Sequence, residues 1–158
     1  MPSMTETIER TVPASPSRVW ELWTTPEGIS RWWAPKGFRT DVSRLDLRAG
    51  GELVYTMTAV AAEQVAFMEQ NGMPLATESR KRFTEVTEPS RLGYRSVIDF
   101  VPDHEPYEQL TQVELEAVEG GTRVQMVVEP LHDEVWTQRL LAGRANELDN
   151  LIVLVASE

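Results

Sequence analysis

Five polar side chains have types that could do chemistry in this sequence: His104, Tyr107, His132, Arg144 and Asp99. Tyrosine, histidine and arginine around an apolar pocket could catalyse an aldol cyclisation or a dehydration by general acid-base transfer. His104 lies on a proline-rich segment that we expect at a cavity mouth, although a lone loop histidine is more commonly just exposed. His132 directly precedes a helix, where capping is the commoner role. Arg144, if it faces inward, needs a carboxylate such as Asp99 or an acidic ligand, because an unpaired buried charge is strongly destabilising. Facing outward, it is an ordinary surface arginine.

The sequence lacks the patterns of the common catalytic and metal sites. It has no cysteine and no HxxxH or HxH spacing, so we predict no metal. It has no nucleophile elbow and no phosphate-binding glycine loop, and we predict no cofactor. The residues therefore allow catalysis without requiring it.

The composition limits the class of partner. The 158 residues include 15 Lys+Arg and 25 Asp+Glu, and the resulting formal charge of −10 argues against nucleic acid and anionic membrane surfaces, which need a cationic footprint. No apolar stretch approaches the roughly 20 residues that span a bilayer. The first residues have neither the basic region nor the apolar run of a signal peptide. We therefore expect a cytoplasmic protein with a single domain, residues 1–158, and no membrane insertion.

Any site must be positioned by the stretch 18–38, which holds four of the five tryptophans. Val19, Leu22 and Trp23 are spaced three and four apart, which puts them on one face of a helix. Pro26 suits the first turn of a second short helix. Two small aromatic helices in a V are not stable alone, so they require a concave apolar partner.

The remaining segments predict that partner, a sheet with one long helix. Alternating polar and apolar residues between glycine- and proline-rich turns are typical of antiparallel strands. A helix from about residue 133 to 156 carries an apolar stripe and, at about 1.5 Å per residue, is long enough to cross a small sheet. A short helix over 61–72 interrupts the strands and is the best candidate for a flap. Strands are expected at residues 5–12, 38–43, 52–59, 79–88, 92–101, 108–118 and 123–129.

This order of elements predicts an α+β fold of the helix-grip type. In such a fold a curved antiparallel sheet of about seven strands wraps on a long C-terminal helix, and two short helices follow the first strand. Five segments add a resemblance at the level of residues: 8–25, 32–38 (WWAPKGF), 47–52 (LRAGGE), 83–94 and 132–151. Together they resemble the bacterial homologues of the activator of heat shock protein 90 ATPase, a family of the START-like, or SRPBCC, superfamily. The resemblance spans nearly the whole chain.

The resemblance implies a cavity between the helix and the sheet. Its superfamily includes sterol and lipid binders, plant hormone receptors, polyketide aromatase/cyclases and co-chaperone domains, so the fold alone does not choose a function. We first predict a module that holds an apolar, lipid-like or aromatic small molecule. The alternatives are a polyketide cyclase/aromatase-type enzyme and a co-chaperone-like module that contacts a chaperone or another protein. Open sheet edges would also allow a homodimer.

Strand parity and helical spacing select the residues that would line this cavity, although most of them would serve equally well as core. Aromatic and methionine side chains give adaptable pockets for apolar ligands. Many relatives carry Gly-Trp where this chain has Gly143-Arg144, which implies either a more polar cavity or an outward-facing side chain. The predicted ligand-binding residues are Trp32, Trp33, Phe38, Tyr55, Met57, Phe67, Phe83, Tyr94, Phe100, His104, Trp136, Leu140 and Arg144.

Overall fold

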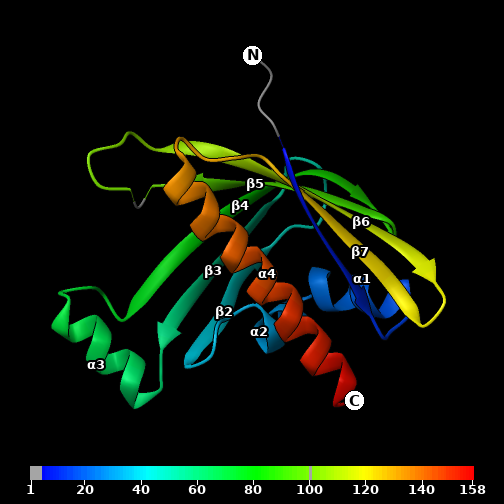
Figure 1. Cartoon of the computed structure of the whole chain (residues 1–158), viewed down its shortest axis with the longest axis horizontal. Coiled ribbons are helices and arrows are strands. Elements are labelled where there is room, and N and C mark those ends of the chain that lie inside the picture. The colour runs from blue at the N-terminus through cyan, green and yellow to red at the C-terminus, as the bar shows by residue number, and fades with distance from the viewer. Residues whose placement is uncertain (1–4, 100) are drawn as a thin grey trace.

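The computed structural model describes residues 5–99 and 101–158 and has the predicted helix-grip architecture. Seven strands form one antiparallel sheet in the order β1-β7-β6-β5-β4-β3-β2, and a long C-terminal helix crosses its concave face (Figure 1). Two short helices follow the first strand and a third helix lies between β3 and β4. The elements are β1 (Glu6–Val12), α1 (Pro16–Thr24), α2 (Pro26–Trp32), β2 (Phe38–Leu45), β3 (Glu52–Ala59), α3 (Ala62–Gln70), β4 (Ala76–Thr87), β5 (Arg91–Ile98), β6 (Tyr107–Val118), β7 (Gly121–Val128) and α4 (Glu134–Ala156).

Side-chain alternation along the strands determines which face of the sheet packs against α4. In β7, Val124, Met126 and Val128 are completely buried, while the residues between them are half-buried. Successive side chains of a strand point to opposite faces, so one face of the sheet belongs to the core and the other to the surface. The sheet is therefore half-buried, as the alternating sequence predicts.

The two short helices begin at side-chain caps and pack tightly on each other. The Ser15 hydroxyl accepts a hydrogen bond from the Arg18 amide at 3.2 Å, and the Thr25 hydroxyl accepts one from the Gly28 amide at 3.1 Å. Both satisfy amides that have no partner within the first helical turn. A Cβ atom at Gly28 would lie 2.6 Å from the Leu22 Cα atom, so glycine permits this close approach of α2 to α1.

The tryptophans of α1 and α2 form the centre of the core. Trp23 meets Trp32 edge to face with ring centroids 4.8 Å apart, and Trp33 lies 5.1 Å from Trp32. These three rings are at most 2% exposed. The Trp32 indole nitrogen donates a hydrogen bond to the Leu22 carbonyl at 2.8 Å, which links α2 to α1. Edge-to-face packing of this kind adds to the gain from burial alone.

The C-terminal end of α4 is attached to the two short helices. Glu158 forms ion pairs with Arg18 of α1 and with Arg31 of α2, and the Arg18 guanidinium lowers the pKa of the Glu158 carboxyl group. Asn150 donates a hydrogen bond to the Ala34 carbonyl at 3.2 Å. These contacts fix one end of α4 over the tryptophan cluster.

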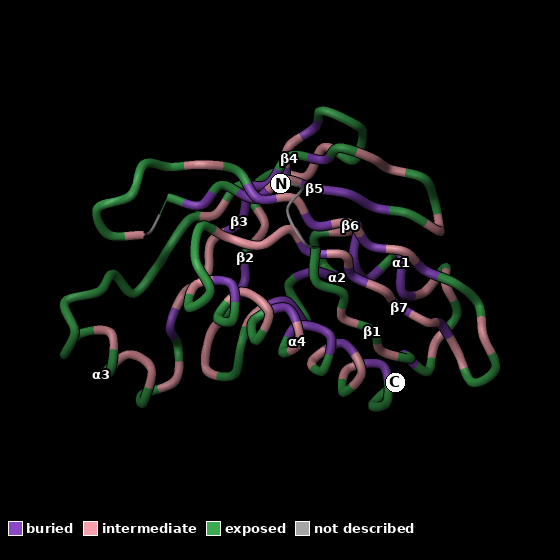
Figure 2. The backbone as a smooth tube through the Cα atoms, turned by 45° about the horizontal axis from the view of Figure 1, so that its top comes forward, coloured by how far each residue is buried: buried purple, intermediate pink, exposed green. Residues whose placement is uncertain are grey.

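Helix α3 stands apart from the body of the molecule (Figure 1). It has no buried residue, and Figure 2 shows only exposed and half-buried positions along it. Phe67, on this helix, is 59% exposed. Among the described residues no helix has the length and apolar character needed to cross a membrane.

Trp33→Ala should lower the free energy of unfolding by about 3–5 kcal/mol, because it removes a completely buried ring. Trp136 of α4 is only half-buried, so Trp136→Ala should cost less, about 1–2 kcal/mol. Urea unfolding of both variants measures the difference. A loss below about 1 kcal/mol at Trp33 would contradict its place in the core.

Candidate functional site

A lysine lies inside the molecule, on the concave face of the sheet. Alternation along β4 places Lys81 on the same face as Ser79 and Phe83, and its register partners are Leu53 of β3 and Ser96 of β5. Lys81 is only 5% exposed. A charged lysine is almost never buried without a partner, so this position is unusual for the residue type.

Aromatic rings and one hydroxyl surround the Lys81 amine. Its Nζ atom hydrogen-bonds to the Ser96 hydroxyl at 2.7 Å. It lies 5.1 Å from the ring centroid of Tyr94 and 5.8 Å from those of Trp33 and Tyr55. Trp33 therefore connects the tryptophan core to the lysine site. Ring faces attract a cation, but they replace only part of its lost hydration.

Helix α4 brings an arginine and a glutamate to the same interior. Arg144 donates a hydrogen bond from its Nη1 atom to the Glu147 Oε1 atom at 3.0 Å, and the side chains are 8% and 10% exposed. They belong to the inward stripe of α4 that also carries the buried Leu148 and Leu151. The space under α4 thus contains two basic side chains and one acidic one.

These groups shift one another's protonation. Burial lowers the pKa of Lys81 from 10.5 to about 7, and the Arg144 guanidinium also lowers it, while Glu147 raises it. Burial raises the pKa of Tyr55 and that of Tyr94. For Arg144, burial acts to lower the pKa while Glu147 acts to raise it, and the net direction is upward. The arginine therefore stays charged, and the lysine is poised to lose its proton near neutral pH.

Several buried polar atoms around this lysine find no hydrogen-bond partner among the described residues. They are the hydroxyl of Tyr94, the Nε atom of Arg144, the Oε2 atom of Glu147 and the indole nitrogen of Trp33. Nearly all buried polar groups in proteins are hydrogen-bonded, because an unpaired group loses its hydrogen bonds to water and gains none from the protein. The interior beside Lys81 therefore contains polar atoms as well as aromatic rings.

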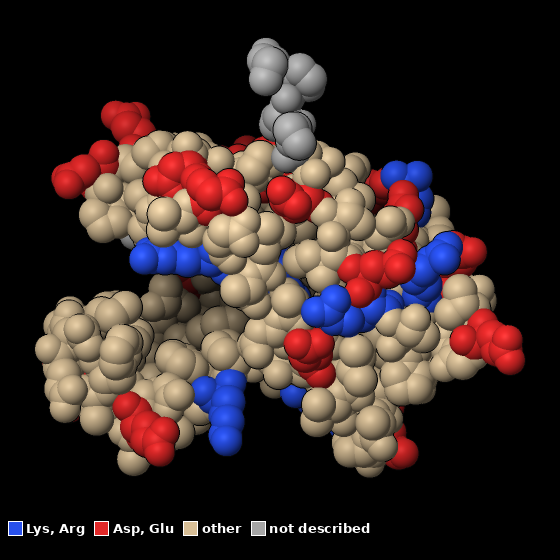
Figure 3. All heavy atoms as spheres, viewed as in Figure 1, with Lys and Arg blue, Asp and Glu red and all other residues tan. Residues whose placement is uncertain are grey.

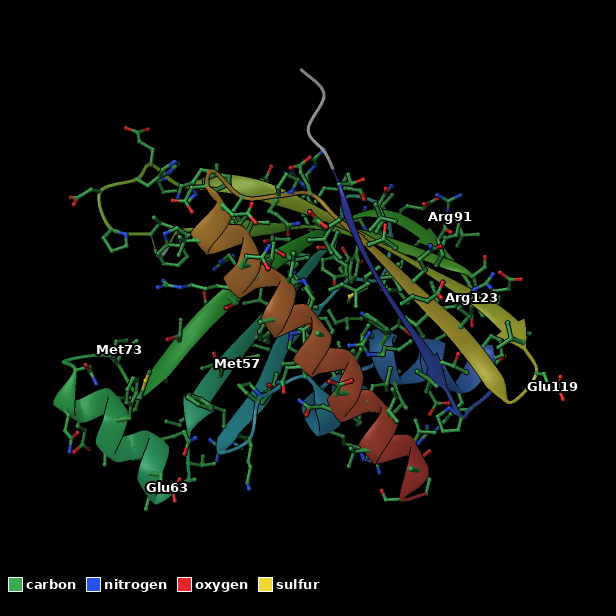
Figure 4. The ribbon with its side chains drawn as sticks, viewed as in Figure 1. Met57, Glu63, Met73, Arg91, Glu119 and Arg123 are labelled. Carbon is green, nitrogen blue, oxygen red and sulfur yellow. The ribbon has the colours of Figure 1, made fainter. Side chains whose placement is uncertain are left out.

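The concave face becomes progressively more exposed from Lys81 toward α3. Along β4 the inward-facing positions pass from buried Lys81 through half-buried Ser79 to exposed Thr77. On β3, Met57 is half-buried whereas Tyr55 is buried. Figure 3 shows the surface hollowed between α3 and the rest of the molecule, and Figure 4 shows Met57 on β3 at this side. The exposure of the concave face thus increases from Lys81 toward the hollow beside α3.

The two histidines meet at a separate position near the start of α4. The rings of His104 and His132 are 4.3 Å apart, and the Tyr107 hydroxyl is 2.7 Å from the His132 Nδ1 atom. Asp133 caps α4 by accepting a hydrogen bond from the Trp136 amide at 2.8 Å. In the described part of the chain no three His, Cys, Asp or Glu side chains gather as they would at a metal. This group differs from the lysine site because it is largely exposed.

The structure brings some of the predicted ligand-binding residues together and separates others. Phe67 lies on α3 and is 59% exposed, so it is not among the buried residues around Lys81. Arg144 faces inward, but its partner is Glu147 and not the exposed Asp99. His104 is exposed, and Phe100 lies outside the described residues. The buried members of the predicted set are Trp32, Trp33, Tyr55, Phe83, Tyr94 and Arg144, and the half-buried ones are Phe38, Met57, Trp136 and Leu140.

Sequence reasoning missed Lys81, Ser96 and Glu147. The sequence contained a signal for Lys81 and for Glu147. In the predicted strand 79–88, Lys81 shares the parity of Phe83, which was assigned to the cavity. Glu147 lies three residues after Arg144, the spacing that places two side chains on one face of a helix. The charges of Lys81 and Glu147 predicted exposed positions, but both residues are buried.

Comparison with known proteins gives a family and a set of folds. Residues 13–147 match the family model described as activator of Hsp90 ATPase homolog 1-like protein. No curated protein shows significant similarity to the chain.

Solved structures of bacterial proteins share this fold. The solution structure of an AHSA1-like protein from Aeromonas hydrophila is 25% identical, with a TM-score of 0.75 over 98% of this chain and 93% of that one. A protein from Chromobacterium violaceum is 22% identical, with a TM-score of 0.74 over 96% of each chain. An AHSA1 protein from Silicibacter pomeroyi is 18% identical, with a TM-score of 0.74 over 97% of this chain and 98% of that one. At such identities the latter two likenesses establish the fold alone.

Lys81→Met should reveal how the buried amine links stability to pH. The pKa of Lys81 is about 7 in the folded protein and has its ordinary value of 10.5 in the unfolded chain. Between these values the unfolded chain binds more protons, so the stability of the wild type rises with pH across that window. Below pH 7 both states are protonated, and the folded state bears the full cost of burying the charge. We expect the wild type to gain about 2 kcal/mol relative to Lys81→Met between pH 7 and pH 9.

Lys36 provides the control for this comparison, because it is the other lysine of the chain and is exposed. The Lys36→Met variant should follow the wild type at every pH. Urea unfolding of the wild type, Lys81→Met and Lys36→Met between pH 7 and pH 9 measures these differences in stability. A constant difference between wild type and Lys81→Met would contradict a buried amine with a lowered pKa.

Glu147→Gln should destabilise the protein more than Arg144→Met. Loss of the carboxylate leaves two buried basic groups without a counter-charge, at a cost of about 3–5 kcal/mol. Loss of the guanidinium leaves Glu147 facing Lys81, which then carries its proton more readily. Chemical unfolding at pH 7 compares the two variants, and equal losses would show that the three groups do not act together.

Proposed function

This chain belongs to the activator of Hsp90 ATPase homolog 1-like family, and from that premise we propose that it binds a small organic molecule between α4 and the sheet. The observation that carries the proposal is the group of unpaired buried polar atoms on Tyr94, Arg144, Glu147 and Trp33. A ligand oxygen placed there would satisfy donors that the protein leaves without acceptors. Among the functions considered for this fold, binding accounts best for such an arrangement.

The site favours a ligand with an apolar or aromatic body and one oxygen-bearing polar end. The walls are the rings of Trp33, Tyr55 and Tyr94, which suit an aromatic or aliphatic body. The Arg144 guanidinium is the natural partner of a carboxylate or carbonyl oxygen, since it has an unused N–H group. We propose that the ligand enters from the hollow beside α3, past Met57. This ligand is more polar at one end than the apolar molecule that the sequence predicts.

An enzyme of the cyclase or aromatase type is the second candidate. The observation that favours it is the convergence of Lys81, Tyr55, Tyr94, Arg144 and Glu147, several of them with shifted pKa values. Groups with perturbed protonation cluster at catalytic sites, because they must exchange protons near the working pH. An amine near neutrality could remove a proton next to a ligand carbonyl, and a tyrosine could hydrogen-bond to the resulting enolate.

The other expectations remain predictions. Exposed apolar side chains on and beside α3, Phe67, Met73 and Leu75, would support a contact with another protein. A homodimer, a chaperone partner, a single domain and a cytoplasmic location are proposals of the same kind. Native mass spectrometry of the protein purified from its host would detect a retained small molecule or a second copy of the chain.

Binding of 2-naphthoate should quench the fluorescence of the buried tryptophans in a saturable way. The probe has an aromatic body and one carboxylate, and naphthalene serves as the matched probe without oxygen. Arg144→Met should weaken binding of 2-naphthoate about tenfold or more, since a hydrogen bond to a charged group is lost. Binding of naphthalene should change little.

The matched control is Arg139→Met on the same helix. The Arg139 guanidinium lies 4.8 Å from the Trp136 ring and its side chain is exposed, outside the lysine site. This variant should bind both probes as the wild type does. Absence of saturable quenching by either probe, or equal weakening by both arginine variants, would overturn the proposed site.

A further inference from the structure

The environment of Lys81 fits a neutral amine better than an ammonium ion. Its hydrogen-bond partner is the Ser96 hydroxyl, and among the described residues no carboxylate forms an ion pair with it. An ammonium group has three N–H donors and no acceptor, so a single hydroxyl leaves it poorly satisfied. A neutral amine needs fewer hydrogen-bond acceptors than an ammonium group and keeps a lone pair. Three aromatic rings then form the remaining wall.

The charged neighbours of Lys81 also favour the neutral form of its amine. The guanidinium of Arg144 opposes a second positive charge, and Glu147, which would favour one, already forms an ion pair with that arginine. The other titratable groups facing the amine are Tyr55 of β3 and Tyr94 of β5. A lysine that is desolvated beside another cation is activated as a nucleophile, because its lone pair is free near neutral pH.

We propose that Lys81 is a nucleophilic amine that captures the carbonyl carbon of a ligand as an imine. This rests on the proposed function, and it assigns to the bound molecule a ketone or an aldehyde. A second oxygen on the ligand, as in a β-dicarbonyl compound or an oxo acid, would accept a hydrogen bond from the unpaired Nε atom of Arg144. The aromatic rings around the amine would hold the body of such a ligand.

The reaction is balanced without an oxidant or a metal. The Nζ lone pair forms a C–N bond as the electrons of the carbonyl double bond move to its oxygen, and a proton passes from nitrogen to that oxygen to give a carbinolamine. The C–O bond then breaks, the second amine proton leaves, and one water is released. The Tyr94 hydroxyl, beside the Lys81 amine, would donate a hydrogen bond to the departing oxygen. Hydrolysis reverses the sequence and restores the lysine.

The chain offers an unusually clean test, because Lys36 and Lys81 are its only lysines. The full chain is incubated with 1-phenylbutane-1,3-dione, an aromatic β-diketone whose imine tautomerises to a conjugated enaminone. The near-ultraviolet absorption of the enaminone reports the reaction. Intact mass should increase by the diketone less one water, and peptide mapping locates the change. Mapping also separates the two lysines from the chain's α-amino group.

We expect the adduct at Lys81 to exceed that at Lys36 by at least about tenfold at pH 8, because the buried amine is largely unprotonated there. The rate should rise through about pH 7 and then level off. Lys36→Arg should react as the wild type does, whereas Lys81→Arg should lose the fast adduct. The wild-type peptide map alone carries the result if Lys81→Arg fails to fold.

The outcomes separate the inference from the proposed function. Saturable quenching by 2-naphthoate or by the diketone, with no adduct or with equal adducts on both lysines, would overturn the nucleophilic role and leave the binding site in place. No quenching by any probe and no adduct would overturn both. A fast adduct at Lys81 that 2-naphthoate slows would support both, because the two molecules then share one site.

Discussion

Two basic side chains and one acidic side chain share the buried space between α4 and the sheet, and the interior depends on their balance. Lys81 comes from β4, while Arg144 and its partner Glu147 come from α4. The sheet and the helix α4 therefore both place charged side chains in this interior. Such a cluster stabilises a fold less than apolar side chains of the same volume would. The proposed recognition of a polar ligand would account for its presence.

The tryptophan core and the lysine site form one continuous structure. Caps at Ser15 and Thr25 start the short helices, and the rings of α1 and α2 pack edge to face against one another. Trp33 then meets Tyr55 and Tyr94, with ring centroids 5.9 and 6.4 Å away, and these rings form the wall beside the amine. Because the wall packs against the core, its rings would already be in place when the proposed ligand binds. Preorganisation of this kind reduces the entropic cost of binding.

Sequence reasoning gave most of the fold and named several of the residues that the structure buries beside Lys81. Strand parity and helical spacing predicted that Trp33, Tyr55 and Tyr94 face inward, and all three are buried. The period of a buried face is a local property of the chain, so the sequence shows it. Phe67 is exposed, and nothing in the local sequence shows that α3 lacks a partner to pack against. Lys81 and Glu147 were missed because each charge argues for solvent exposure when considered alone. Only the tertiary packing, which brings β4 and α4 together, shows that Lys81 is buried beside the Arg144–Glu147 ion pair.

The central claim is that Lys81 is a buried amine that is largely neutral above pH 7. An NMR titration of the lysine Cε resonances tests it directly, since the chain has two lysines and Lys36→Met and Lys81→Met assign them. We predict that the Lys81 resonance titrates with a pKa of about 7. A midpoint near the ordinary lysine value of about 10.4 would contradict the account, because it would show an amine that remains charged at neutral pH.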